Sequence, residues 1–163
     1  MATIAFKGLR EYEEKLSKLN AGTEEMIGKA IYEGAGVVAD SVRSATSSIP
    51  IVRSNQRGGE ENKLDGITSK QKAGLLDGLG ISKMRHENGY YNVKIGFDGY
   101  NDVRTKKYPS GQPNALIARS VIRGTSFRAR NDFVSKAVNS SRKAAESIMA
   151  QTFDEEINKV MKG

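Results

Sequence analysis

The chain has 163 residues, a length typical of one domain, so we expect residues 1–163 to fold around one core. It has no Cys and one His, which excludes disulfide scaffolds, thiolate metal sites, cysteine nucleophiles and metal sites built on a pair of histidines. Its net charge of +7 is concentrated in residues 41–130, where 16 Lys and Arg accompany 7 Asp and Glu, a distribution typical of proteins that contact nucleic acid or an acidic protein.

The N-terminal part is expected to form a strand followed by two helices. Residues 3–7 have strand-like composition, and apolar residues recur at helical spacing from Leu9. Residues 20–22, which end in a Gly, predict a helix stop, and Thr23 is then expected to cap a second helix that runs to about residue 47. The sequence shows no charged leader before an apolar run and no stretch of the ~18 apolar residues that a membrane span needs, so we expect no membrane segment.

Two long loops are expected, at about 46–66 and 99–113. The first is rich in Gly, Arg and Glu, so we expect it to be flexible in the free subunit. Its core candidates are Ile49, Ile51, Val52 and Leu64. After it, Thr68 is expected to cap a short helix that ends near Leu76.

The clearest strand pattern lies between residues 81 and 98. One apolar face alternates with polar or small residues, and it consists of Tyr91, Val93, Ile95 and Phe97. Asn88-Gly89 supplies the positive φ angles of a tight type I′ turn. Residues 81–88 and 90–98 are therefore expected to pair as an antiparallel hairpin.

Two helices complete the predicted elements. Asn114 is expected to cap a short helix over 115–123 that Gly124 ends, and Asn131 or Asp132 to cap a long C-terminal helix. The apolar stripe of that last helix is Val134, Val138, Ser141, Ala145, Ile148, Met149, Phe153, Ile157 and Val160.

These elements predict an α+β fold. A small, mainly antiparallel sheet from residues 3–7, 81–88 and 90–98 is expected to be packed by a long N-terminal helix and a long C-terminal helix. The two long loops would then lie on the surface, where binding residues often occur.

The sequence lacks the residues that common catalytic mechanisms need. His86 is the only histidine that could activate a nucleophile, and its position two residues before the hairpin turn is typical of an exposed strand residue. Acidic pairs such as Glu24-Glu25 occupy neighbouring helix positions that do not face each other, so they are solvated charges. We therefore expect no enzymatic activity, no cofactor and no metal site.

Basic and aromatic residues are interleaved in the second loop and near residues 124–133. Such residues anchor protein interfaces and also contact phosphates and bases, but they match no known nucleic-acid-binding motif. We expect at most non-specific DNA contact. Phe133, next to a helix start, fits local packing as well as an interface. The predicted protein-interface residues are Tyr100, Lys106, Lys107, Tyr108, Phe127, Arg128 and Arg130.

Three groups of motifs resemble a family of bacteriophage tail components. Phe6–Leu9 precedes a Glu- and Lys-rich helix, Gly74–Ile81 leads into Asn92–Tyr100, and Gly124–Ser126 precedes Asp132–Val134. In their order and spacing these motifs are similar to the tail-completion (neck) family typified by gene product ten of the Hong Kong 97 lambdoid phage. Asp132 stands where that family usually has Pro.

The resemblance implies a structural virion protein of the neck, made in the host bacterial cytoplasm, that acts in tail completion or head–tail joining. It implies a homo-oligomeric ring, expected to be hexameric, at the head-proximal end of the tail tube of a phage or a tailocin. The implied partners are the tail tube protein and the head–tail connector or stopper proteins. Two alternatives stay open: a tail terminator that caps tube polymerisation, and a small non-enzymatic nucleic-acid-binding protein.

Overall fold

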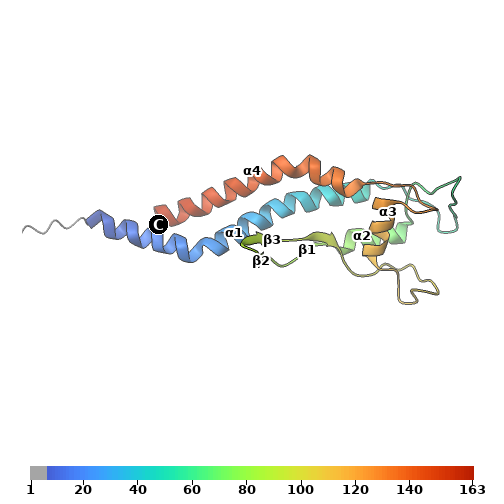
Figure 1. The fold of residues 1–163 in the computed structure, drawn as a ribbon, viewed down its shortest axis with the longest axis horizontal. Coiled ribbons are helices and arrows are strands. Elements are labelled where there is room, and N and C mark those ends of the chain that lie inside the picture. Colours follow the sequence, from blue (N-terminus) through green and yellow to red (C-terminus); the bar gives the residue numbers. More distant parts are fainter. Residues whose placement is uncertain (1–6) are drawn as a thin grey trace, which may run out of the picture.

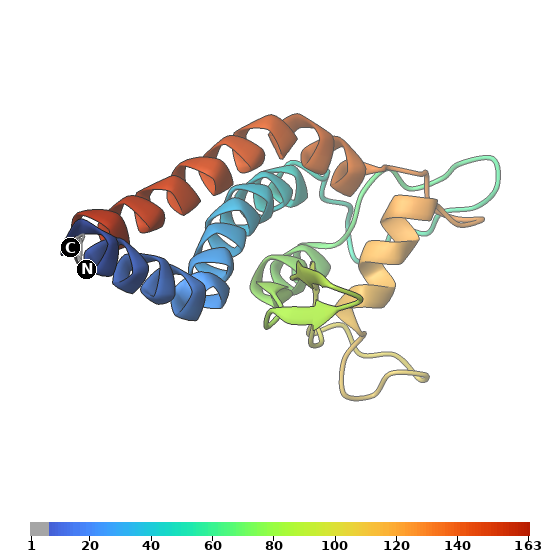
Figure 2. The ribbon, with the colours of Figure 1, turned by 60° about the vertical axis from the view of Figure 1, so that its left-hand side comes forward.

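The computed structural model describes the backbone of residues 7–163 and the side chains from Glu14 onward. Two long helices lie side by side and extend away from a cluster of shorter elements (Figures 1 and 2). The elements are α1 (Lys7–Ser47), α2 (Ser69–Gly78), β1 (Leu79–Ile81), β2 (Arg85–Glu87), β3 (Tyr90–Asn92), β4 (Ile95–Phe97), α3 (Asn114–Arg123) and α4 (Phe133–Lys162). The predicted α+β class is confirmed. No helix in the described part of the chain has both the length and the apolar character that crossing a membrane requires.

α1 is one continuous helix, so the break expected at residues 20–22 is wrong. Thr23 does not cap a second helix, because its hydroxyl donates a hydrogen bond to the carbonyl of Leu19 at 2.7 Å, as Thr can do inside a helix. Packing along α4 outweighs the weak helix propensity of Gly22. The strand expected at residues 3–7 lies outside the described residues, except for Lys7, which begins α1.

Small residues allow α1 and α4 to approach each other closely. The buried positions of the two helices include Ala30, Gly34, Ala35, Ala39, Ala137, Ser141 and Ala145. Gly34 marks the tightest approach, because a Cβ added there would lie 2.3 Å from Cγ of Met149. The contact between the helices therefore depends on the absence of a side chain at one position of α1.

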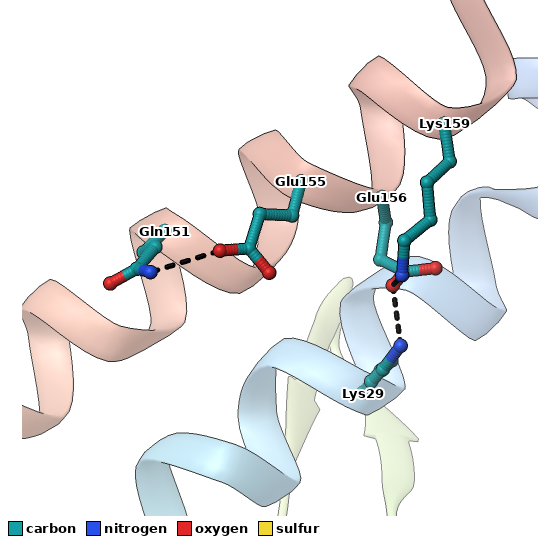
Figure 3. Close-up of polar contacts among 5 residues, drawn as sticks. All are labelled: Lys29, Gln151, Glu155, Glu156 and Lys159. Carbon is teal, nitrogen blue, oxygen red and sulfur yellow. Dashed lines mark hydrogen bonds and ion pairs between the residues drawn. The ribbon is translucent and has the colours of Figure 1, made fainter.

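The outer halves of these helices, residues 14–33 of α1 and 146–162 of α4, are called the arm below. Within the arm, the Glu156 carboxylate accepts hydrogen bonds from Lys159 at 2.6 Å and from Lys29 of α1 (Figure 3). These bonds, first that of Lys159, lower the pKa of Glu156 below its ordinary value of 4.5. The bond to Glu156 in turn raises the pKa of Lys29. Exposed ion pairs add little stability, so this cluster mainly orients one helix on the other.

The predicted hairpin is present, and it contains a bulge. Asn88 and Gly89 have φ angles of 53° and 80°, as a type I′ turn requires. β2 pairs with β3 next to this turn, and β1 pairs with β4 farther from it, with Leu79 opposite Phe97. Three residues separate β1 from β2, whereas two separate β3 from β4. The extra residue is a β-bulge, which interrupts the ladder and splits the hairpin into two short pairs.

The hairpin packs against α1 and the start of α4. The hydroxyl of Tyr32 on α1 accepts a hydrogen bond from the Met84 backbone N–H at 2.8 Å, within the bulged segment. At the other end of the hairpin, the rings of Phe97 and Phe133 lie 6.1 Å apart between centroids. The main core forms there, and its buried members are Val42, Ile49, Ile67, Leu75, Leu79, Ile117, Ala118, Val121, Phe133 and Ala137.

Two of the predicted helix N-caps are present in the structure, and a third is not. Thr68 accepts a hydrogen bond from the Gln71 backbone and completes a capping box, and Asp132 caps α4 through the backbone N–H of Ser135. Asn114 is not a cap, because it is already the first residue of α3 and its buried side chain donates to the carbonyl of Asp98 at 2.8 Å. The position before it, Pro113, is the N-cap, and no side chain caps α3.

Candidate functional site

Three loop segments, residues 48–68, 98–113 and 124–132, gather at the end of the molecule away from the arm (Figures 1 and 2). This region is called the loop end below. The segments are joined by backbone hydrogen bonds, notably between Leu64 and the 124–132 segment. The loop end is therefore a set of connected loops on a helical scaffold.

Backbone hydrogen bonds join the two ends of the 48–68 segment to each other. The backbone N–H of Val52 donates to Ile67 at 2.9 Å, and that of Ile67 donates to Pro50 at 3.0 Å. Ile67 is fully buried although the sequence analysis did not name it, whereas the expected core residue Ile51 is 60% exposed. The expected flexibility of this loop therefore concerns its middle, residues 53–63, which is almost entirely exposed.

The loop after β4 carries two lysines on a tight turn. Thr105 and Tyr108 donate backbone hydrogen bonds to each other at 3.1 Å, so Lys106 and Lys107 occupy the tip of a two-residue turn. The ammonium of Lys107 lies 5.6 Å from the ring centroid of Tyr108, within the range of a cation–π contact. The backbone of Tyr108 therefore fixes where the two charges are placed.

A second turn carries Phe127. The backbone N–H of Thr125 donates to the carbonyl of Arg128 at 2.9 Å and closes this turn, called the Phe127 turn below. Leu64 holds it from the other side, donating to Phe127 at 2.9 Å and accepting from Ala129 at 2.8 Å. The Phe127 side chain is nevertheless 44% exposed. An apolar ring on a fixed backbone is a feature of interface anchors, because little conformational freedom is lost on binding.

Arg128 is buried beside Phe127. One guanidinium nitrogen donates to the Ser120 hydroxyl at 3.2 Å, its Nε has no partner, and no ion pair joins Arg128 to a described carboxylate. Burial lowers its pKa, but an arginine remains charged in a protein. The loop end thus contains a buried positive charge that the described residues do not neutralise.

The structure gathers the seven predicted interface residues at the loop end, with different exposure. Tyr100 is 69% exposed, and Lys106, Lys107 and Arg130 are also exposed. Tyr108 is half-buried. Arg128 contacts its own chain instead of presenting its guanidinium to solvent, and Phe133 belongs to the core.

Two concave sites were not predicted from the sequence, because each is lined by segments that are distant along the chain. A cavity of about 540 Å³ at the loop end is lined by residues of the 48–68 and 98–113 segments and of the start of α2, including Arg53, Lys70 and Arg104. An apolar groove of about 440 Å³ lies between α1, α4 and the hairpin turn. No periodicity within one segment indicates either of them.

The candidate catalytic residue has the environment that the sequence predicts. His86 is exposed on β2, and its ring stacks on Tyr91 with centroids 4.4 Å apart. Among the described residues, no group of three or more His, Asp or Glu is close enough together to hold a metal ion.

Comparison with models of known protein families, with curated proteins and with solved structures gave no match to this chain.

Proposed function

We propose that the chain is a non-enzymatic structural subunit of the neck of a tailed phage or tailocin, acting in tail completion or head–tail joining. Copies form a ring, expected to be hexameric, at the head-proximal end of the tail tube. They contact the tube protein on one side and connector or stopper proteins on the other. The proposal places the protein in the assembled particle after its synthesis in the bacterial cytoplasm.

The observation that carries the proposal is the division of the molecule into a helical scaffold and one end made of loops. The loop end presents Tyr100, Phe127 and the Lys106-Lys107 tip on turns whose backbones are hydrogen-bonded. Exposed aromatic and basic residues on a rigid scaffold suit contacts with other proteins. A ring subunit needs such surfaces and needs no catalytic group.

The motifs that resemble the neck family support the proposal, because the second and third groups meet in space. Within the second group, Leu79 pairs with Phe97, and Phe97 packs against Phe133 of the third group. Within the second group, the structure requires Gly at position 78, because a Cβ there would lie 2.1 Å from the carbonyl oxygen of Asp98. These two groups of motifs therefore belong to one packed unit.

A tail terminator would use a similar ring, so the decisive test must separate the two roles. Deleting the gene in a particle-producing strain and imaging the lysate by electron microscopy does so. For a completion protein we expect DNA-filled heads and tails of normal length that are not joined, or, for a tailocin, tubes that lack their end ring. Supplying the wild-type chain from a plasmid should restore the particles. Overlong tubes would instead identify a terminator, and normal particles would overturn both roles.

The second candidate function is nucleic-acid binding, favoured by the excess of Lys and Arg at residues 98–132, seven against three acidic residues. Contacts to phosphates alone are independent of sequence and weaken steeply with salt. We expect a mobility shift of DNA to disappear by about 200 mM salt. A shift that persists there and prefers one sequence would favour this candidate over the structural one.

A further inference from the structure

The apolar groove lies on the arm side of the molecule, at the hairpin turn. It has a volume of about 440 Å³ and is lined mainly by Ile27 and Ile31 of α1, Tyr90 at the start of β3, directly after the turn, and Met149, Ala150 and Phe153 of α4. All of its described lining residues are uncharged. Tyr90 is 76% exposed at the groove, the most exposed large hydrophobic side chain among the described residues. A groove of this kind accepts an apolar side chain from outside.

The subunit cannot fill this groove with its own loop end. Ser47, where α1 ends, lies sixteen residues beyond Ile31 along a continuous helix, which corresponds to about 24 Å at 1.5 Å per residue. The loop segments begin only after that point and lie at the opposite end of the molecule (Figure 1). A loop-end segment that fills the groove must therefore belong to another copy of the chain.

The charges of the two regions are complementary. The arm carries eight acidic and five basic residues, whereas residues 98–132 carry seven basic and three acidic residues. Among the acidic residues of the arm, Glu146 and Asp154 are exposed and flank the groove-lining stretch 149–153 of α4. Opposite electrostatic potentials favour the encounter of the arm of one copy with the loop end of another. Like potentials disfavour contacts between two arms or between two loop ends.

The Phe127 turn is the part of the loop end that suits the groove. It presents an apolar ring on a backbone held by Leu64, with Arg130 exposed nearby. Arg128 beneath it carries the charge that no described carboxylate neutralises. Its guanidinium lies 5.9 Å from the ring centroid of Phe127, within the range of a cation–π contact, so the inserted ring would bring a positive charge close to an acidic partner surface.

We propose that the Phe127 turn of one copy inserts into the groove between α1, α4 and the hairpin turn of the next copy. The contact uses two different surfaces, so it is heterologous, and repetition produces a closed ring or an open filament. The inference deepens the ring in the proposed function and rests on it. Its test uses only the purified subunit, whereas the neck role is tested by the gene deletion. Either of the two proposals can therefore fail while the other is supported.

The test uses one variant for each surface. Phe127→Ser removes the inserted ring, and Ala150→Arg places a charged side chain in the groove at an exposed position of α4. Ala144→Arg is the matched control, because Ala144 is also exposed on α4 but does not line the groove. Circular dichroism checks that each variant folds, and Tyr90→Ala is a second groove variant should Ala150→Arg not fold.

Sedimentation velocity measures the outcome. We expect the wild type and Ala144→Arg to form oligomers whose association weakens as salt is added. Each surface variant should associate with an affinity at least about tenfold lower. An equimolar mixture of Phe127→Ser and Ala150→Arg should form 1:1 dimers and nothing larger, because only one intact turn and one intact groove can meet. A monomeric wild type, unchanged association of either variant, or a mixture without dimers would overturn the proposal.

Discussion

Two glycines of α1, only two residues apart, should respond differently to the same substitution. Replacing Gly by Ala inside a helix stabilises it by up to ~1 kcal/mol, because Ala loses less conformational entropy. A Cβ at Gly36 would meet nothing within 4 Å. We therefore expect Gly36→Ala to raise the free energy of unfolding by about 1 kcal/mol, and the melting temperature by about 2–4 °C.

Gly34→Ala gains the same helix propensity but collides with α4. Its Cβ would lie 2.3 Å from Cγ and 2.6 Å from Sδ of Met149, and 3.2 Å from the backbone oxygen of Ala145. The Met149 side chain can turn away in part, but the Ala145 backbone can yield only if the helices separate. Overpacking of this kind costs about 1–3 kcal/mol. The two variants should therefore differ by about that amount in free energy of unfolding, with Gly34→Ala the less stable.

Urea unfolding followed by circular dichroism measures both values, and a double-mutant cycle identifies the cause. In a Met149→Ala background, which removes the colliding atoms, Gly34→Ala should become less harmful by more than ~0.5 kcal/mol. If Gly34→Ala stabilised the protein as much as Gly36→Ala, the close approach of α1 and α4 would be wrong. Equal effects of Gly34→Ala in both backgrounds would exclude Met149 as the obstacle.

Three further predictions concern the loops, the core and the arm. Trypsin should cut first at Arg57 or elsewhere within residues 53–63, and first cleavage inside α4 would contradict the described packing. Tyr108→Ala should leave the melting temperature nearly unchanged, whereas Leu75→Ala, at a fully buried position, should cost ~2–5 kcal/mol; equal losses would place the loop in the core. The lowered pKa of Glu156 contributes stability that is present in full above pH 4.5 and is lost as the pH falls through the lowered pKa. Between pH 5 and 3, the melting temperature of Glu156→Gln should therefore fall less than that of the wild type. Parallel curves of melting temperature against pH would refute this prediction.

Features coded by neighbouring residues could be predicted from the sequence. The Asn88-Gly89 turn and the caps at Thr68 and Asp132 depend on backbone angles or bonds within three residues, and all three are present. Gly124, with a φ of 71°, ends α3 as expected. Local chemistry is sufficient for such features because no distant segment competes with it.

Features that depend on distant contacts could not be predicted in the same way. Residues 20–22 carry a real stop signal, but packing along α4 continues the helix through it. Asn114 has the composition of a cap, yet Asp98, sixteen residues earlier, binds its side chain. Ile67 is buried in the main core, formed by residues distant along the chain, and a backbone bridge to Ile51 joins it to the start of the loop. The interface candidates were found by residue type, while the groove was missed because α1, α4 and the hairpin form it together.

The pairing of α1 with α4 also sets the order in which the protein can fold during its synthesis. The α1 half of the arm leaves the ribosome more than a hundred residues before its partner in α4, since Lys29 binds Glu156 and Lys15 binds the Met161 carbonyl. At 5–20 residues per second this delay is roughly 6–25 s. The hairpin, α2 and α3 can form in that interval, but the face of α1 that packs on α4, where Gly34 meets Met149, stays uncovered until α4 emerges. Until α4 has closed on α1, this face of the helix remains accessible to chaperones and proteases.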